Sequence, residues 1–315
     1  MFGRACYSFC HCMPPFRCNI CGRSNPENAE PPDRERPSCG HCGSNIRVRG
    51  LLHALSTELF GTSLVLPDFP RARSLRGLGT SDSNSYALLL ADRLDYRNTF
   101  FDREPRFDVA TPPEQDFGQY DFILSSDVFE HVLPPLEGAF RNCWQLLRDP
   151  GLLVFTMPYS IEPETLEHYP ELHQFGFTQI AGETVLVNRT AVGAWQVFER
   201  PVFHRGITGD SLEVREINEV ELKRVLAAAG FSEVHIYAEG YPPFGIVQAE
   251  KWSLPVVARK GKFTLNPAAM RDIVEEWRRL AEGNRNLKNS FWFRAGRELF
   301  HLGRKGGIFR DPGAS

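Results

Sequence analysis

The chain has 315 residues, of which 42% are hydrophobic and 12% aromatic, and it carries a formal charge of −3 at pH 7. This length predicts one large domain with attached segments, and the apolar fraction is sufficient for a packed interior. A charge so close to zero excludes a strong overall attraction to nucleic acid or to anionic lipid. No run of about 18 apolar residues occurs, and the N-terminal stretch has no apolar signal-peptide core. We therefore expect a soluble, cytoplasmic protein without a transmembrane segment.

We divide the chain into a cysteine-rich module over residues 1–45, a main domain over residues 46–262 and a helical, basic tail over residues 263–315. The main domain begins with a helical pattern that ends near Gly61. Residues 62–70 are typical of a short strand followed by a turn.

Seven of the eight cysteines lie in the first 42 residues, and this clustering favours metal binding over a network of disulfides. Two Cys-x-x-Cys pairs, separated by 17 residues, can each place two thiolates on one turn and together complete a tetrahedral zinc site. The zinc would be structural, since four thiolates leave no open coordination position. Gly22 and Gly43 directly follow the pairs, where a tight turn favours glycine. The predicted metal ligands are Cys18, Cys21, Cys39 and Cys42.

The remaining cysteines do not repeat this pattern. Cys6, Cys10 and Cys12 are irregularly spaced, and we expect them to lie in a disordered leader. Cys143 falls on the apolar face of a predicted helix, where a thiol packs as a small hydrophobe.

Strands and helices alternate through the rest of the main domain. Residues 73–102 predict a strand, a glycine-containing turn, a helix and a second strand, and short strands are expected at 106–111 and 120–126. Strands alternating with helices predict an α/β fold with a mainly parallel sheet that is covered on both faces. An amphipathic helix is predicted at 136–147 and an apolar strand at 152–160. After the insertion, a helix begins with a capping box at Asn218 and Glu221 and ends at Gly230, and a strand follows it. A further strand is predicted at 254–261, and a last helix begins at Asn266 and Pro267.

Residues 159–217 interrupt this alternation with many aromatic residues and several histidines. An insertion over the carboxyl edge of an open α/β sheet is a natural substrate lid, because ligands bind at that edge. His168 and His173 are five residues apart, which does not place them on one helix face, and we interpret them as lid residues. The tail from Arg285 to Arg310 is basic and aromatic, so it suits peripheral contact with a membrane, an anionic substrate or packing on the domain.

Gly77 and Gly79 belong to a Gly-x-Gly stretch that favours close approach of the backbone to a nucleotide. Asp82 stands where a dinucleotide fingerprint has its third glycine, and a carboxylate there would repel a pyrophosphate. The pattern therefore disfavours a nicotinamide oxidoreductase and tolerates a cofactor without phosphate. Further carboxylates follow at predicted strand ends, at Asp102, Asp108 and Asp127.

The block from Gly77 to Tyr159 resembles class I S-adenosylmethionine-dependent methyltransferases, particularly the group called type 11. The strongest match is the stretch YDFILSSDVFEHVLPPLEGAFRNCWQLLRDPGLLVFTMP, which is similar to the fourth strand, an acidic-His segment, a helix and the fifth strand of that family. The resemblance implies a doubly wound, Rossmann-like sheet with an antiparallel last strand. The four-cysteine module would then be a zinc-ribbon-like attachment.

The resemblance also implies positions for S-adenosylmethionine. Gly77 and Gly79 would face its methionine part, and Asp102 would contact its ribose. The adenine would lie near Asp108 and Val109, and the pocket beside the sulfonium would be lined by Ser125 and Asp127. We also place Asp82 among the cofactor-binding residues. Asp127 and Glu130 have the spacing of a capping box as well, so helix entry is a second explanation for both carboxylates.

Methyl transfer needs a base only where the acceptor must lose a proton. The candidates are His131, Asp127, Tyr159 and His204, with His131 first because it directly follows a strand end. The expected acceptor is a small molecule or a glycan, and the acidic pI of about 6.3 disfavours nucleic acid. The alternative is a non-catalytic, methyltransferase-like scaffold whose zinc module binds a partner.

Overall fold

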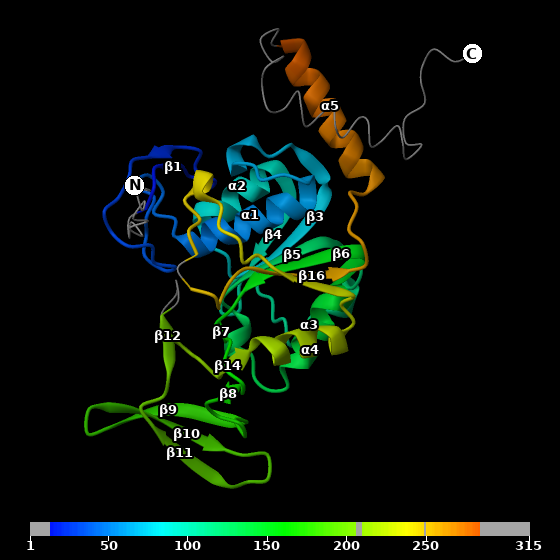
Figure 1. Cartoon of the computed structure of the whole chain (residues 1–315). Helices are drawn as coiled ribbons and strands as arrows, with labels where there is room; N and C mark the ends of the chain where they lie inside the picture. The colour runs from blue at the N-terminus through cyan, green and yellow to red at the C-terminus, as the bar shows by residue number, and fades with distance from the viewer. Residues whose placement is uncertain (1–12, 206–209, 249, 284–315) are drawn as a thin grey trace, which may run out of the picture.

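The computed structural model of the chain describes residues 13–205, 210–248 and 250–283 (Figure 1). Its centre is a six-stranded sheet in the order β15-β16-β6-β5-β3-β4. β16 runs antiparallel to both of its neighbours, whereas β6, β5, β3 and β4 are mutually parallel. The Rossmann-like fold with an antiparallel last strand is thus confirmed. The strands are β3 (Ala72–Thr80), β4 (Leu94–Thr99), β5 (Tyr120–Ser126), β6 (Leu147–Thr156), β15 (Glu233–Ile236) and β16 (Val256–Lys260).

Helices cover both faces of this sheet. Alternate side chains of each strand point to opposite faces, so Phe122 and Leu124 of β5 join one hydrophobic cluster and Ile123 joins the other. Because both faces are covered, the first six residues of β5 are all buried, and its centre is the apolar run from Phe122 to Leu124. One face packs against α1 (Ile46–Phe60), α2 (Asn84–Arg93) and α5 (Pro267–Gly283), and the other packs against α3 (Leu136–Leu146) and α4 (Glu219–Ala229).

Asparagine side chains cap three of the helices, two of them at the predicted positions Asn218 and Asn266 and the third at Asn45. The side chains of Asn45, Asn218 and Asn266 each accept a hydrogen bond from the amide three residues on, which satisfies a donor that the helix leaves unpaired. Gly61 and Gly230 end α1 and α4 in the left-handed backbone conformation.

Three local predictions are wrong. Residues 62–70 form no strand; they contain the short 3-10 helix η1 (Leu66–Asp68), where a proline withholds its backbone donor. Residues 106–111 form only a single parallel bridge, between Arg106 and Phe100. The predicted glycine turn also lies elsewhere, because both glycines are inside β3 and the chain turns at Ser81, whose φ is 60°.

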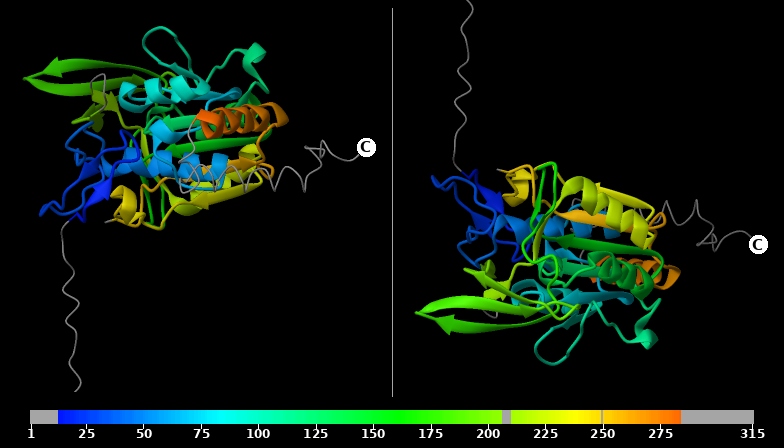
Figure 2. Two further views of the ribbon diagram at one scale, coloured as in Figure 1. Left: turned by 90° about the horizontal axis from the view of Figure 1, so that it is seen from above. Right: turned by 90° about the horizontal axis from the view of Figure 1, so that it is seen from below.

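The insertion forms short strands and a separate three-stranded antiparallel sheet in the order β11-β10-β9. This sheet extends away from the central sheet in every view (Figures 1 and 2). It has a small hydrophobic cluster of its own, to which Leu186 belongs. The strands of the insertion are β7 (Tyr159–Ser160), β8 (Leu166–Glu167), β9 (Gln174–Ile180), β10 (Glu183–Arg189), β11 (Trp195–Glu199), β12 (Phe203–Arg205), β13 (Asp210–Leu212) and β14 (Arg215–Asn218).

The short elements that remain are β1 (Phe16–Arg17) and β2 (Ser24–Asn25) of the cysteine module and the 3-10 helices η2 (Glu114–Asp116), η3 (Phe129–His131) and η4 (Pro242–Phe244). Within the described residues, no helix is long and apolar enough to span a membrane. The predictions for Cys6, Cys10 and Cys12 and for the tail from Arg285 to Arg310 concern residues outside the described part of the chain.

Candidate functional site at the carboxyl edge of the sheet

The order of the central strands reverses between β3 and β5. From β3 the chain continues to β4 on one side, and it then crosses to β5 on the other side. Open α/β sheets bind ligands in the crevice at the carboxyl ends of the strands where such a reversal occurs. The two ends meet here: Thr80 lies opposite Ser125, and the Thr80 hydroxyl donates to Ser125 Oγ at 2.8 Å.

Asp127, the first residue after β5, is held by two arginines. Its Oδ1 lies 3.0 Å from Nη2 of Arg34, and its Oδ2 lies 3.1 Å from Nε of Arg47. The carboxylate side chain is only 7% exposed. Burial alone would raise its pKa, but the guanidinium groups of Arg47 and then Arg34 outweigh it and hold the pKa of Asp127 well below its ordinary value.

The capping-box interpretation of Asp127 is therefore wrong. Its backbone has a φ of 50°, and η3 begins two residues later without a side-chain cap. The α-helix that follows starts only at Leu136, after two prolines. The carboxylate of Asp127 instead forms ion pairs with Arg34 and Arg47, which lie far from it in the sequence.

Both arginines belong to segments near the cysteine module. Arg34 lies between the two cysteine pairs, and its Nε also donates to the carbonyl of Ser253 at 2.8 Å. Arg47 lies in the first turn of α1 and contacts the Ser126 hydroxyl and Glu35. The module thus closes over the carboxyl end of β5 with a charged network.

Asp82 is buried between two tyrosines and does not face solvent. Tyr86 donates to its Oδ1 at 2.6 Å, and Tyr96 donates to its Oδ2. Burial raises the pKa of Asp82 to about 7, against the opposing effect of the two hydroxyl donors. The neighbouring glycines are packed by the protein itself: a Cβ on Gly77 would overlap the Phe122 ring, and one on Gly79 would overlap the Tyr96 hydroxyl and Asp82.

The residues predicted to contact ribose and adenine lie at the end of β4. The bridge between Phe100 and the segment before Asp108 places that segment beside this strand end. Asp102 is exposed. Asp108 accepts hydrogen bonds within its own turn, from the amide of Ala110 at 2.8 Å and from the hydroxyl of Thr111 at 3.2 Å. Val109 is buried in the hydrophobic cluster of α3.

The predicted bases lie in different surroundings. Nδ1 of His131 is 2.7 Å from the carbonyl oxygen of Leu212, and since a carbonyl only accepts, Nδ1 carries the proton of the neutral ring. Its Nε2 faces Glu130 at 3.7 Å. Tyr159 is fully buried, and burial raises its pKa to about 12. His204 belongs to β12.

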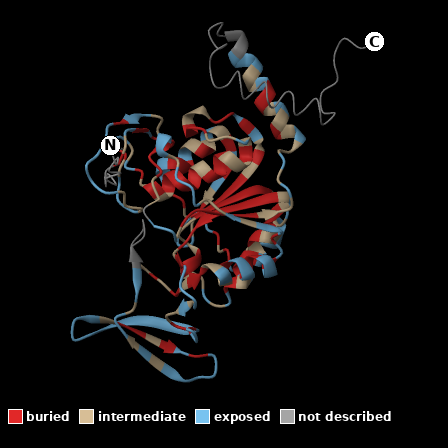
Figure 3. Cartoon of the chain, viewed as in Figure 1, coloured by how far each residue is buried: buried red, intermediate tan, exposed pale blue. Residues whose placement is uncertain are grey.

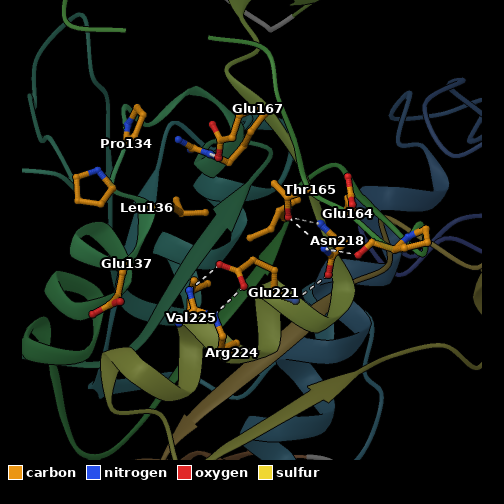
Figure 4. A pocket seen from close by; sticks show the side chains of 14 residues that line it. Pro134, Leu136, Glu137, Glu164, Thr165, Glu167, Asn218, Glu221, Arg224 and Val225 are labelled. Atoms are coloured by element: carbon orange, nitrogen blue, oxygen red, sulfur yellow. Dashed lines mark hydrogen bonds and ion pairs between the residues drawn. The ribbon is translucent and has the colours of Figure 1, made fainter. Parts of the chain in front are cut away.

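A surface pocket of about 660 Å³ is formed by the starts of α3 and α4 and by residues of the insertion (Figure 4). Its most buried polar side chain is Arg215, which is 1% exposed. Arg215 donates to Glu167 at 2.8 Å and to the carbonyl of Val132 at 2.6 Å, so it ties the insertion to the segment after η3. The pocket is lined by Pro134, Pro135, Leu136, Glu137, Pro163, Glu164, Thr165, Glu167, Arg215, Ile217, Asn218, Glu221, Arg224 and Val225.

The four predicted metal ligands form one cluster, with all Sγ atoms within 4.8 Å of one another. The Sγ atoms of Cys18 and Cys42, and those of Cys21 and Cys39, are 3.7 Å apart. Sulfur atoms about 2.3 Å from a tetrahedral zinc ion lie about 3.8 Å apart, whereas a disulfide would need about 2 Å. The cluster therefore has dimensions that suit zinc.

The backbone and the surroundings support the same interpretation. Gly22 and Gly43 take positive φ values of 77° and 70°, and their amides donate to the carbonyls of the first cysteine in each pair. Ser44 lies 3.2 Å from the Sγ of Cys18. The buried guanidinium of Arg49 donates to the Ser44 carbonyl and places a positive charge beside the four sulfur atoms.

Several site residues are missing from the sequence-based predictions. Arg34 and Arg47 hold Asp127, Tyr86 and Tyr96 hold Asp82, and Arg215 underlies the pocket. Arginine and tyrosine are ordinary surface and core residues in a sequence, and except for Tyr86, which is four residues from Asp82, they are distant from their partners along the chain. Arg47 and Asp127 are 80 residues apart. Only the fold brings such residues together.

No family model and no curated protein matches the sequence. Solved structures are similar at low identity. The CMeT domain of the citrinin polyketide synthase is 15% identical with a TM-score of 0.35, and the match covers 60% of this chain and 47% of that chain. CalS10, an amino pentose methyltransferase from Micromonospora echinaspora, is 14% identical with a TM-score of 0.38, and the match covers 69% of this chain and 92% of that chain. A putative S-adenosylmethionine-dependent methyltransferase from Listeria monocytogenes is 9% identical with a TM-score of 0.39, and the match covers 68% of this chain and 97% of that chain. At these TM-scores the similarities carry no conclusion about activity.

Proposed function

We propose that the protein is an S-adenosylmethionine-dependent methyltransferase. The observation that carries this proposal is the reversal of strand order between β3 and β5, at which the most family-like stretch of the sequence supplies Ser125 and Asp127. The antiparallel β16 beside β6 supports the same assignment, because the sequence resemblance implies it.

The cofactor would lie along the carboxyl ends of β4, β3 and β5. Asp102 and Asp108 are the side chains proposed for its ribose and adenine, and Ser125 is proposed to line the wall beside its sulfonium. When bound, S-adenosylmethionine supplies a methyl group that is already activated, because it leaves a neutral thioether behind. The chain's own task is therefore mainly to orient an acceptor.

We propose that the acceptor, a small molecule or a glycan, takes the 660 Å³ pocket. This volume lies in the range of small-molecule sites, and the lining combines apolar side chains such as Leu136 and Ile217 with polar ones such as Arg215. The proposed base for an acceptor that must lose a proton is His131, which lies in η3, three residues before Pro134 of the pocket lining. With Nδ1 donating to the Leu212 carbonyl, the ring would take the proton at Nε2, 3.7 Å from Glu130.

Zinc at the four cysteines would be structural. The four thiolates would complete its coordination, so no position would remain for substrate or water. Its proposed effect is to hold the turns that carry Arg34 to the carboxyl edge of the sheet.

A specific observation favours a second function, a non-catalytic scaffold. Asp127 is neutralised by Arg34 and Arg47, and the space beside Gly77 and Gly79 is filled by aromatic side chains. A sheet edge closed in this way holds no cofactor unless the charged network opens.

Calorimetric titration of the zinc-loaded protein with S-adenosylhomocysteine separates the two functions. The methyltransferase is expected to bind at micromolar concentration, and Asp102→Ala is expected to weaken binding at least about tenfold. Asp95→Ala is the matched control, because Asp95 lies on the same strand β4 but near its amino end. A folded protein that releases no heat with S-adenosylhomocysteine would be the scaffold.

A further inference from the structure

Most residues of the three-stranded sheet in the insertion are exposed (Figure 3), and many of the exposed ones are large and apolar. Of the sixteen large hydrophobic residues exposed in the described part of the chain, eight lie between residues 175 and 203. A soluble chain seldom leaves so many apolar side chains together unless they bind something. The eight residues are Phe175, Phe177, Ile180, Val192, Trp195, Val197, Val202 and Phe203.

The edge strand β9 is the least covered element of this sheet. All seven of its residues are exposed, and only one of its edges is paired, with β10. Natural edge strands are commonly protected by charges, prolines or bulges that prevent pairing with another chain. The sequence of β9, QFGFTQI, contains no charge and no proline, and its register with β10 is regular over all seven residues.

One row of apolar side chains runs across the sheet and stops at this edge. Phe198 of β11, Leu186 of β10 and Phe177 of β9 lie opposite one another in register. Leu186 is fully buried, and Phe198 packs edge-on against Tyr169 with ring centroids 4.9 Å apart. Phe177 is the last residue of this row within the sheet; its ring centroid lies 5.3 Å from that of Phe203 of β12, and Phe177 is still 48% exposed. A continuation of the sheet would cover it.

We propose that β9 pairs antiparallel with β9 of a second copy of the chain, on a two-fold axis at Phe177. In this register Phe175 lies opposite the partner's Gln179, and each Phe177 lies opposite the partner's Phe177. The two apolar rows then form one row across a continuous six-stranded sheet. A strand without charge meets itself with no like-charge repulsion, and aromatic pairs opposite each other stabilise antiparallel strands. The interface is isologous, as in most symmetric dimers.

Charge variants at the axis test this arrangement. Phe177→Glu and Phe177→Lys each place two like charges opposite each other, so each variant alone is expected to be monomeric and to raise the dimer dissociation constant at least about tenfold. An equimolar mixture of the two variants places opposite charges together and is expected to form dimers again. Light scattering coupled to size-exclusion chromatography measures the mass in each case.

Val197→Glu is the matched control. Val197 is also an exposed apolar residue of this sheet, but it lies on the other edge strand, β11, so its dimer should match that of the unchanged protein. Recovery of the dimer in the mixture also proves that both charge variants fold. A monomeric unchanged protein at hundreds of micromolar, dimers in either charge variant alone, or a mixture that stays monomeric would each overturn the proposal.

Discussion

The cysteine module and the β9–β11 sheet are both additions to the central sheet, and they treat apolar surface in opposite ways. Phe16 and Ile20 of the module are buried in the same hydrophobic cluster as Leu55 of α1. The β9–β11 sheet shares no cluster with the central sheet, and its side chains pack around a small group that includes Leu186. An addition that shares its core is part of the folding unit, whereas one with its own core can carry a binding surface without disturbing the rest.

The largest expected effect comes from breaking the four-cysteine cluster, which we propose holds zinc. Cys39→Ala removes a ligand that is buried in the shared cluster, so the protein should lose its zinc and more than about 5 kcal/mol of unfolding free energy. Elemental analysis and urea unfolding measure the two effects. Cys143→Ala is the control: it removes a buried thiol elsewhere, costs about 1 kcal/mol and leaves zinc content unchanged. Full zinc occupancy in Cys39→Ala would show that the cluster is not the metal site.

Truncating one leucine in each cluster tests the difference between the two additions, with a smaller expected loss of stability. Leu55→Ala leaves a cavity in the shared cluster and should lower the global unfolding free energy by about 3 kcal/mol. Leu186→Ala leaves a similar cavity, but we expect its cost to be confined to the β9–β11 sheet. Hydrogen exchange in low urea reports this as faster exchange in β9, β10 and β11 with unchanged protection in the central sheet. Equal loss of protection in both regions would mean that they unfold together.

The sequence predicts the elements whose signals are local. The helix ends at Asn218, Asn266 and Gly61 are local signals because one side chain or one backbone angle decides each boundary. The cysteine cluster is predictable for the same reason, since its spacing encodes its geometry. Residues 106–111 carry an equally strand-like pattern and still form only a bridge, because strand pairing depends on what lies beside the segment.

The candidate site is less predictable because its charges are satisfied by distant residues. The position of Ser125 and Asp127 at the sheet edge follows from the strand pattern, and the structure places them there. The surroundings and the ionisation of the carboxylates at this edge do not follow from the strand pattern. Asp127 is ionised by two arginines from outside the main strand pattern, whereas Asp82, at the same edge, is buried between tyrosines. Both arginines are 80 or more residues from Asp127 in the sequence, and of the two tyrosines only Tyr86 is close to Asp82 in the sequence, four residues after it.

The smallest expected effect tests how the module is joined to the sheet edge. Asp127→Asn removes the buried one of the two carboxylates that Arg34 and Arg47 contact, the other being Glu35, and should lower the unfolding free energy near neutral pH by about 2 kcal/mol. The pKa of Asp127 is lower in the folded protein than its unfolded value of about 3.9. Its contribution is therefore complete above that value and is lost as the pH falls toward the folded pKa. Urea unfolding of the two proteins should thus differ near neutral pH and converge in acid. A difference that persists unchanged in acid would mean that the variant acts through packing and not through the ion pairs.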